Sequence, residues 1–173
     1  MSQQTQNIMK KISLSKVVLN MGVGKSGEPI ETAKAALQQI AENKPNARNA
    51  KKTQRDWGVR KGEPIGVIVT TRNQDAVPLL KKLLEAKGNQ INEKAFDNEG
   101  NFSFGISEHI DIPGVKYDPN IGILGLDIAV SLIRPGYNVK TRSKHKAKIG
   151  KKHKITKNDA IKFMTENFEV TVV

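Results

Sequence analysis

The residues with the clearest chemical signature are three glycines between a predicted strand and a predicted helix. Gly22, Gly24 and Gly27 match the GxGxxG spacing of a dinucleotide-binding turn. Such a site also needs an acidic residue about 20 positions later to bind the ribose hydroxyls, but that stretch contains Arg48 and Lys51 instead. We therefore expect a glycine-rich turn that presents backbone N–H groups to a phosphate. A nucleotide-binding enzyme that uses these glycines remains the alternative.

Other patterns that could support catalysis or metal binding are weak. The three histidines, His109, His145 and His153, have no HExxH spacing, and the chain contains no cysteine. Asp111 and Asp118 are close in sequence, but carboxylates in such a loop are more typical of loop capping than of acid–base catalysis. The sequence therefore predicts no metal site, no cofactor and no enzymatic activity.

The charge balance points to a polyanionic partner. The 173 residues include 29 Lys and Arg but 17 Asp and Glu, which gives a formal net charge of +12. The longest apolar run, residues 65–69, is far shorter than the roughly 20 residues of a membrane-spanning helix. The N-terminal MSQQTQN lacks a secretory pattern. We therefore expect a cytoplasmic protein that does not bind membranes.

The basic residues gather in two segments that are predicted to form loops. Residues 44–61 contain seven basic residues and one acid, and residues 140–157 contain nine basic residues, two histidines and no acid. One such run is often only a solvated surface. A segment of nine like charges, however, stays extended unless phosphates or counterions neutralise it. We expect both segments to bind nucleic acid and the second to contribute nothing to the core.

The only tryptophan lies inside the first basic segment. Trp57 stands between Arg55 and Arg60 and is followed by Gly58. An aromatic ring among cations on a loop tip can stack on an unpaired base. The competing interpretation is that Trp57 folds back onto the core.

Hydrophobic periodicity predicts the elements that carry these loops. Alternating patterns predict strands over residues 12–21, 64–72, 102–106, 126–134 and 169–173. Helical spacing predicts helices from Pro29 to about Asn43, from an Asp75 cap to Gly88, and after a Thr156 cap. In the second helix the expected buried stripe consists of Val77, Leu80, Leu83 and Leu84. A turn over 97–100 should join two strands, and 113–125 should form a surface loop. No linker divides the chain, so we expect one domain over 1–173, with basic loops at about 44–63 and 135–157.

Three stretches carry a family resemblance. They are VVLNMGVGKSG (17–27), GNFSFGISEHIDIPGVKYDP (100–119) and IGILGLDIAV (121–130). Together they resemble the universal large-subunit ribosomal protein five family, the 5S rRNA-binding protein of the central protuberance. Residues 134–156 are similar to its archaeal and eukaryotic branch. The resemblance implies an α+β fold with a mixed, mostly antiparallel sheet, helices on one face and RNA on the other.

The resemblance also implies contacts for individual residues. Contacts with 5S rRNA and large-subunit rRNA are implied for Asn20, Met21, Gly22, Asn43, Lys44, Arg48, Lys51, Lys52, Thr70, Arg72, Arg134, Lys140, Arg142, Lys144, Lys146 and Lys148. A loop that reaches P-site transfer RNA is implied for Arg55, Trp57, Gly58, Arg60 and Lys61. An intersubunit contact with small-subunit protein thirteen is implied for Ile112, Pro113, Gly114, Val115, Lys116, Tyr117 and Asp118. Neighbouring proteins of the central protuberance are further implied partners.

Overall fold

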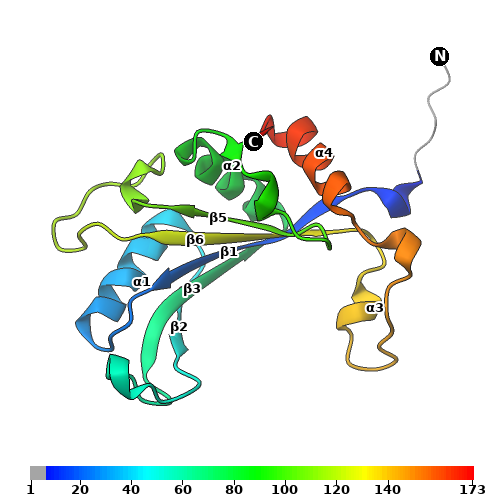
Figure 1. The fold of residues 1–173 in the computed structure, drawn as a ribbon. Coiled ribbons are helices and arrows are strands. Elements are labelled where there is room, and N and C mark those ends of the chain that lie inside the picture. Colours follow the sequence, from blue (N-terminus) through cyan, green and yellow to red (C-terminus); the bar gives the residue numbers. More distant parts are fainter. Residues whose placement is uncertain (1–6) are drawn as a thin grey trace.

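The computed structural model describes residues 7–173 and shows an α+β fold built on one large antiparallel sheet (Figure 1). Residues 1–6, which include most of the N-terminal stretch assessed for a secretory signal, lie outside the described residues. The sheet order is β2 (Asn46–Asn49), β3 (Pro64–Arg72), β1 (Ser13–Gly22), β6 (Leu126–Ile133) and β5 (Phe102–Ile106). The helices are α1 (Glu28–Ile40), α2 (Ala76–Ala86), α3 (Asn138–Thr141) and α4 (Lys157–Phe168). A small parallel pair joins β4 (Gln90–Ile91) to β7 (Thr171–Val172).

The strands form because their apolar residues alternate with polar ones. In β1, Val17 and Leu19 are fully buried, and β1 pairs with β3 on one side and with β6 on the other. Directly paired residues of antiparallel strands point to the same face, so Val69, the partner of Leu19, lies on this apolar face as well. Helices α1 and α2 pack against the central strands and contribute fully buried residues such as Leu37 and Leu80. The core therefore lies between the sheet and these helices.

The structure corrects the predicted details of α2. Asp75 ends a short 3-10 turn, has helical backbone angles and makes no capping hydrogen bond through its side chain. Val77 is 37% exposed, whereas Leu79 is buried. The buried stripe is rotated because the helix follows directly on this turn and presents Ala76 to the core.

Two further expectations need correction. The turn at 97–100 does not join two full strands: β5 pairs with β6, and the segment before the turn contributes only a bridge between Phe96 and Phe102. The second basic segment does contribute to the core, because Ile155 is 1% exposed. The predicted Thr156 cap is confirmed, since its side chain and that of Asp159 form a capping box at α4.

Candidate nucleic-acid interface

The face of the sheet that points away from the core carries polar and apolar side chains in rows across the strands. In the register of the sheet, Asn20 pairs with Ile68 of β3 and with Asp127 of β6. The next residues on this face are Val18 and its partner Thr70. These side chains are half-buried or exposed. Figure 1 shows α2 and α4 on one side of β5 and β6 and α3 on the other. The sheet therefore offers a broad surface whose polar groups are fixed by strand pairing.

Cationic side chains flank this face. Arg72 pairs with Lys16 at one end, and Arg48 pairs with Gly66 at the other, where Gly66 also pairs with Gly22. Of the predicted rRNA-contacting residues, the structure thus brings onto one face Asn20, Gly22, Arg48, Thr70 and Arg72. Lys16 belongs to the same face and was missed, although its even position in β1 could have revealed it.

The two glycines at the Arg48 end keep the surface flat. A Cβ atom on Gly66 would lie 2.9 Å from the carbonyl oxygen of Met21, so a larger residue would push the strands apart. Gly22 has no neighbour within 4 Å of such a position. The absence of side chains at Gly22 and Gly66 leaves room beside Arg48 for a sugar–phosphate backbone to approach the sheet.

The glycine turn after β1 does not have the geometry of a dinucleotide site. In such sites the strands before and after the helix lie side by side, whereas β2, the strand that follows α1, is separated from β1 by β3, which is antiparallel to both. The N–H groups of Val23 and Gly24 already donate to the carbonyl oxygen of Ile65, at 3.0 and 2.9 Å. The turn therefore offers fewer free donors than the sequence suggested.

The first basic segment continues β2 and β3 as an ordered hairpin. Gln54 and Val59 exchange two backbone hydrogen bonds of 2.8 and 3.0 Å, and Gly58 closes the tip in the left-handed conformation with φ of 65°. Trp57 is 76% exposed at this tip, so the interpretation that it folds back onto the core is wrong. The cations of the hairpin are exposed as well, namely Lys51, Lys52, Arg55, Arg60 and Lys61.

Asn43 and Lys44 lie at the edge of the sheet beside β3. The Asn43 amide donates to the Thr71 hydroxyl at 3.2 Å, and both Asn43 and Lys44 are exposed. This hydrogen bond fixes the amide while its carbonyl oxygen remains able to accept.

Two predicted rRNA-contacting residues have mainly structural surroundings. The Met21 side chain is 2% exposed in the core, so only its backbone remains available for contact. The Arg134 guanidinium donates to the carbonyl of Lys154 at 3.1 Å and pairs with the Asp159 carboxylate at 3.2 Å. Both predictions stay untested, but these positions make poor first choices for mutagenesis.

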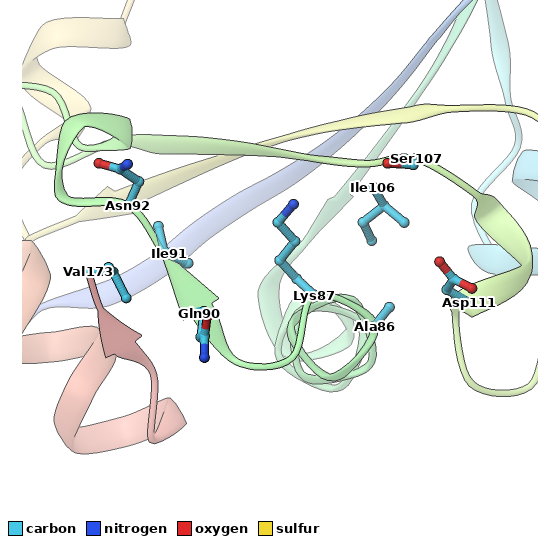
Figure 2. A pocket seen from close by; sticks show the side chains of 9 residues that line it. All are labelled: Ala86, Lys87, Gln90, Ile91, Asn92, Ile106, Ser107, Asp111 and Val173. Atoms are coloured by element: carbon cyan, nitrogen blue, oxygen red, sulfur yellow. The ribbon is translucent and has the colours of Figure 1, made fainter.

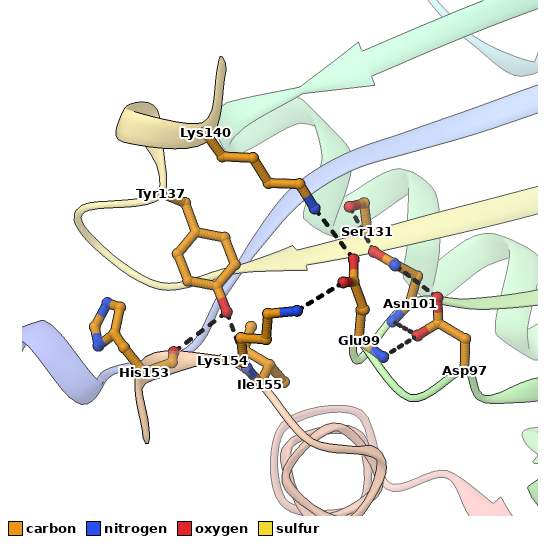
Figure 3. A network of polar contacts seen from close by, with 9 residues as sticks. All are labelled: Asp97, Glu99, Asn101, Ser131, Tyr137, Lys140, His153, Lys154 and Ile155. Atoms are coloured by element: carbon orange, nitrogen blue, oxygen red, sulfur yellow. Dashed lines mark hydrogen bonds and ion pairs between the residues drawn. The ribbon is translucent and has the colours of Figure 1, made fainter. Parts of the chain in front are cut away.

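The second basic segment is held by contacts to the turn at 97–100 and to residues just after β6. Figure 3 shows Lys140 and Lys154 converging on the Glu99 carboxylate, each at 3.1 Å. The hydrogen bond from Lys140, followed in size by the one from Lys154, holds the pKa of this carboxylate below its usual value. The Tyr137 hydroxyl accepts from the Ile155 N–H at 2.9 Å and donates to the His153 carbonyl. Arg142, Lys144, Lys146 and Lys148 remain exposed on this scaffold.

The loop at 112–121 projects from a buried anchor. The His109 side chain is 1% exposed, and its Nδ1 accepts from the Leu124 N–H at 3.3 Å while its backbone N–H donates to the Leu124 carbonyl. Ile112 is buried, but Tyr117 is 59% exposed. The exposed part of the predicted intersubunit contact therefore comprises Pro113, Gly114, Lys116 and Tyr117, with Val115 and Asp118 half-buried.

No arrangement of an enzyme active site is evident elsewhere in the described residues. A cavity of about 520 Å³ opens beside α2 and β4, and Lys87 and Asp111 are its charged side chains (Figure 2). It lacks a nucleophile paired with a base. Residues 7–173 contain neither a group of three potential metal ligands from His, Cys, Asp and Glu nor a helix long and apolar enough to cross a membrane.

Comparison with known proteins gives one consistent result. A family model described as ribosomal protein L5 matches residues 7–60, and a second model, for the C-terminal part of the same ribosomal family, matches residues 64–163. A protein named large ribosomal subunit protein uL5 from Nitrosopumilus maritimus is 69% identical over 99% of both chains. Proteins of the same name from Cenarchaeum symbiosum and Sulfolobus acidocaldarius are 59% and 48% identical. The Cenarchaeum match covers 95% of this chain and 98% of the relative, and the Sulfolobus match covers 97% and 94%.

Proposed function

The chain belongs to the ribosomal protein L5 family, and from this premise we propose that it binds 5S rRNA and attaches it within the central protuberance of the large subunit. As a family member it is a structural, non-enzymatic protein of the ribosome that acts in translation. Its proposed partners are 5S rRNA, large-subunit rRNA and neighbouring proteins of the central protuberance.

The observation that supports this proposal most strongly is the alignment of polar and cationic residues on the open sheet face, which is the face that points away from the core. Asn20 and Thr70 project from adjacent strands, and Arg48 and Arg72 flank them. Strand pairing fixes the spacing of these groups, so they can distinguish one folded RNA from another. The exposed cations of the two basic segments add a charge attraction that does not depend on sequence.

Binding to purified 5S rRNA at several salt concentrations tests the proposal. If about five to eight phosphates are neutralised, the logarithm of the affinity should fall with the logarithm of the salt concentration with a slope of about −4 to −7. Asn20→Ala or Thr70→Ala should reduce the preference for 5S rRNA over an unrelated RNA while leaving the slope nearly unchanged. Equal affinity of the native protein for any polyanion would contradict specific recognition.

We propose that the hairpin tip contacts P-site transfer RNA. Trp57 is exposed on a tip closed by backbone hydrogen bonds, with Arg55 and Arg60 beside it. A rigid aromatic ring among cations can stack on a base or lie against a sugar. Two observations support this contact: the exposed ring on the closed tip, and the family resemblance, which implies that this loop reaches transfer RNA.

We propose that the loop at 112–121 contacts small-subunit protein thirteen. Tyr117 and Ile123 are each 59% exposed, which gives this region an apolar surface suited to a protein partner. Replacing Tyr117 with Ala should weaken the association of the two subunits without changing 5S rRNA binding. Unchanged association in a subunit-joining assay would contradict this contact.

A further inference from the structure

A large cavity lies at the Lys16 end of the open sheet face, beneath the second basic segment. Its volume of about 860 Å³ falls within the range of roughly 300–1,000 Å³ typical of small-molecule sites. One wall consists of strand residues such as Lys16, Arg72 and Ser131, and the other consists of residues after β6, from Tyr137 to Lys154. Segments far apart in the sequence therefore enclose a space larger than a surface contact with one phosphate requires.

The cavity is strongly cationic even after its internal ion pairs are counted. Glu99 is the only acidic residue of its lining, and this carboxylate is already bound by Lys140 and Lys154. The remaining cations of the lining form no ion pair within residues 7–173; they are Lys16, Arg72, Lys146, Lys148 and Lys151. Uncompensated cations around a cavity favour a ligand that carries phosphate.

The same cavity also has an apolar wall that a phosphate would not need. Tyr137, Ala147 and Ile149 line it. The Tyr137 hydroxyl is engaged by the backbone of Ile155 and His153, so the orientation of the ring is fixed (Figure 3). A fixed aromatic ring beside apolar side chains is the usual surface for the flat face of a nucleobase.

A polar edge completes the site. The Ser131 hydroxyl donates to Oδ1 of Asn101 at 2.8 Å, and Nδ2 of Asn101 donates to the Asp97 carboxylate at 2.8 Å. These bonds define the orientation of the amide and leave its second N–H and the Ser131 oxygen for a ligand. Such groups can meet the hydrogen-bonding edge of a base.

We propose that this cavity holds a single unstacked nucleotide of the bound RNA. The base lies against Tyr137 and Ile149, and its phosphate is bound by Lys146, Lys148 and the cations of the sheet end. This inference rests on the proposed function, because it assumes that RNA covers the open face. A free nucleotide has the same chemistry, and the experiments below distinguish the two sources.

Two substitutions of Tyr137 isolate the contribution of the ring. Tyr137→Phe and Tyr137→Leu both remove the hydroxyl and its two hydrogen bonds, but only Tyr137→Leu removes the aromatic plane. We expect Tyr137→Leu to bind 5S rRNA about tenfold more weakly than Tyr137→Phe, as expected for the loss of one base stack. Phe163→Leu on α4, outside the cavity lining, controls for the loss of an aromatic ring elsewhere. Equal affinity of the two Tyr137 variants would overturn the proposal.

Methyl NMR of the full chain locates the base directly. We expect the Ile149 and Ala147 methyl signals to shift through ring currents when 5S rRNA binds, and we expect adenosine 5′-monophosphate to shift them only weakly and to be displaced by the RNA. Adenosine 5′-monophosphate that stays bound in the presence of the RNA would identify a free nucleotide as the ligand and overturn the proposal. RNA binding that leaves both signals unshifted would refute the nucleotide site while the proposed function stands. Absence of any preference for 5S rRNA would instead refute the proposed function.

Discussion

Trp57 is exposed because the backbone around it leaves it no path to the core. The reciprocal hydrogen bonds of Gln54 and Val59 close the tip, and Gly58 supplies the left-handed conformation that non-glycine residues rarely adopt. The side chain thus points to solvent from a short, rigid turn. Such exposure of a large aromatic ring adds nothing to the core, and it leaves the ring available for the proposed contact with transfer RNA.

Trp57→Ala should therefore separate function from stability. Because the ring is 76% exposed, we expect the free energy of unfolding to change by no more than about 0.5 kcal/mol. Retention of P-site transfer RNA on ribosomes that carry the variant should weaken, and Trp57→Phe should restore most of it, since stacking needs only an aromatic plane. A large loss of stability measured by urea denaturation would show that the ring packs inside the protein after all.

Asp159 gives the start of α4 a defined pH dependence. Burial acts to raise the pKa of this carboxyl, but hydrogen bonds from Thr156 and the charge of Arg134 outweigh it, so the pKa is lowered. A lowered folded-state pKa stabilises the protein above the unfolded value near 3.9, and this stabilisation is lost as the pH falls through the folded value.

Asp159→Asn should therefore be less stable than the native chain at pH 7, by about 1 kcal/mol, the usual contribution of a capping contact. Partial exposure of the carboxylate limits the effect. The difference should shrink below about pH 4 and can be followed by urea denaturation at several pH values. Glu166→Gln, an exposed change on the same helix, should show no such trend, and a difference that persists at low pH would contradict the assignment.

Sequence patterns predicted residue positions well wherever a period of two applied. Alternation within each strand set Asn20, Thr70 and Arg72 apart from the apolar residues beside them, and the family resemblance implied that all three contact RNA. The register brings them onto one face. Glu99 and Ser131 were missed because their role depends on pairing with residues distant in sequence, as in the contact between Glu99 and Lys154. No local period encodes such contacts.

Helices and strands could be predicted where one face of the element is buried and the other is exposed, because apolar residues then recur with a fixed period. Segments that lack such a period and are held by long-range contacts were harder to predict. The bounds of β3 matched the prediction, because a short apolar run ends at recognisable polar residues. The second basic segment lacked any apolar period, so the burial of Ile155 was unforeseen. Ile155, which follows Lys154 in this basic segment, becomes a core residue because Tyr137 binds its N–H and the turn at Gly100 makes room for it.

Gly100→Ala tests this fit between two elements. Gly100 has φ of 80°, and an added Cβ would overlap Cγ2 of Ile155 and approach Ala160. We expect a loss of about 2–4 kcal/mol in the free energy of unfolding from backbone strain and overpacking together. Gly150→Ala is the matched control, since Gly150 has a negative φ and open space around its Cα, and it should remain within about 0.5 kcal/mol of the native chain. Equal stability of the two variants would mean that the turn and Ile155 do not pack as described.

The two faces of the sheet differ in what they carry. The helix-covered face of the sheet holds the core, and the opposite face, with the hairpin and the second basic segment at its two ends, carries uncompensated cations. Lysines occur on both sides, however, since Lys81 and Lys82 are exposed on α2. Net charge alone therefore does not define the RNA-binding surface, and the position of each charge has to be tested.

A pair of double variants with the same change in net charge performs that test. Lys51→Gln with Lys52→Gln removes two exposed cations from the hairpin, and Lys81→Gln with Lys82→Gln removes two from the helical layer. If the hairpin lysines contact phosphates, the first variant should reduce the salt-dependence slope of 5S rRNA binding by about one per lysine, because fewer counterions are released. The second variant should keep the slope of the native chain and lose only a little affinity through the weaker long-range field. Equal slopes for the two variants in filter-binding titrations would show that the protein attracts RNA by its total charge. The division of the sheet into a core face and an open face would then not explain RNA binding.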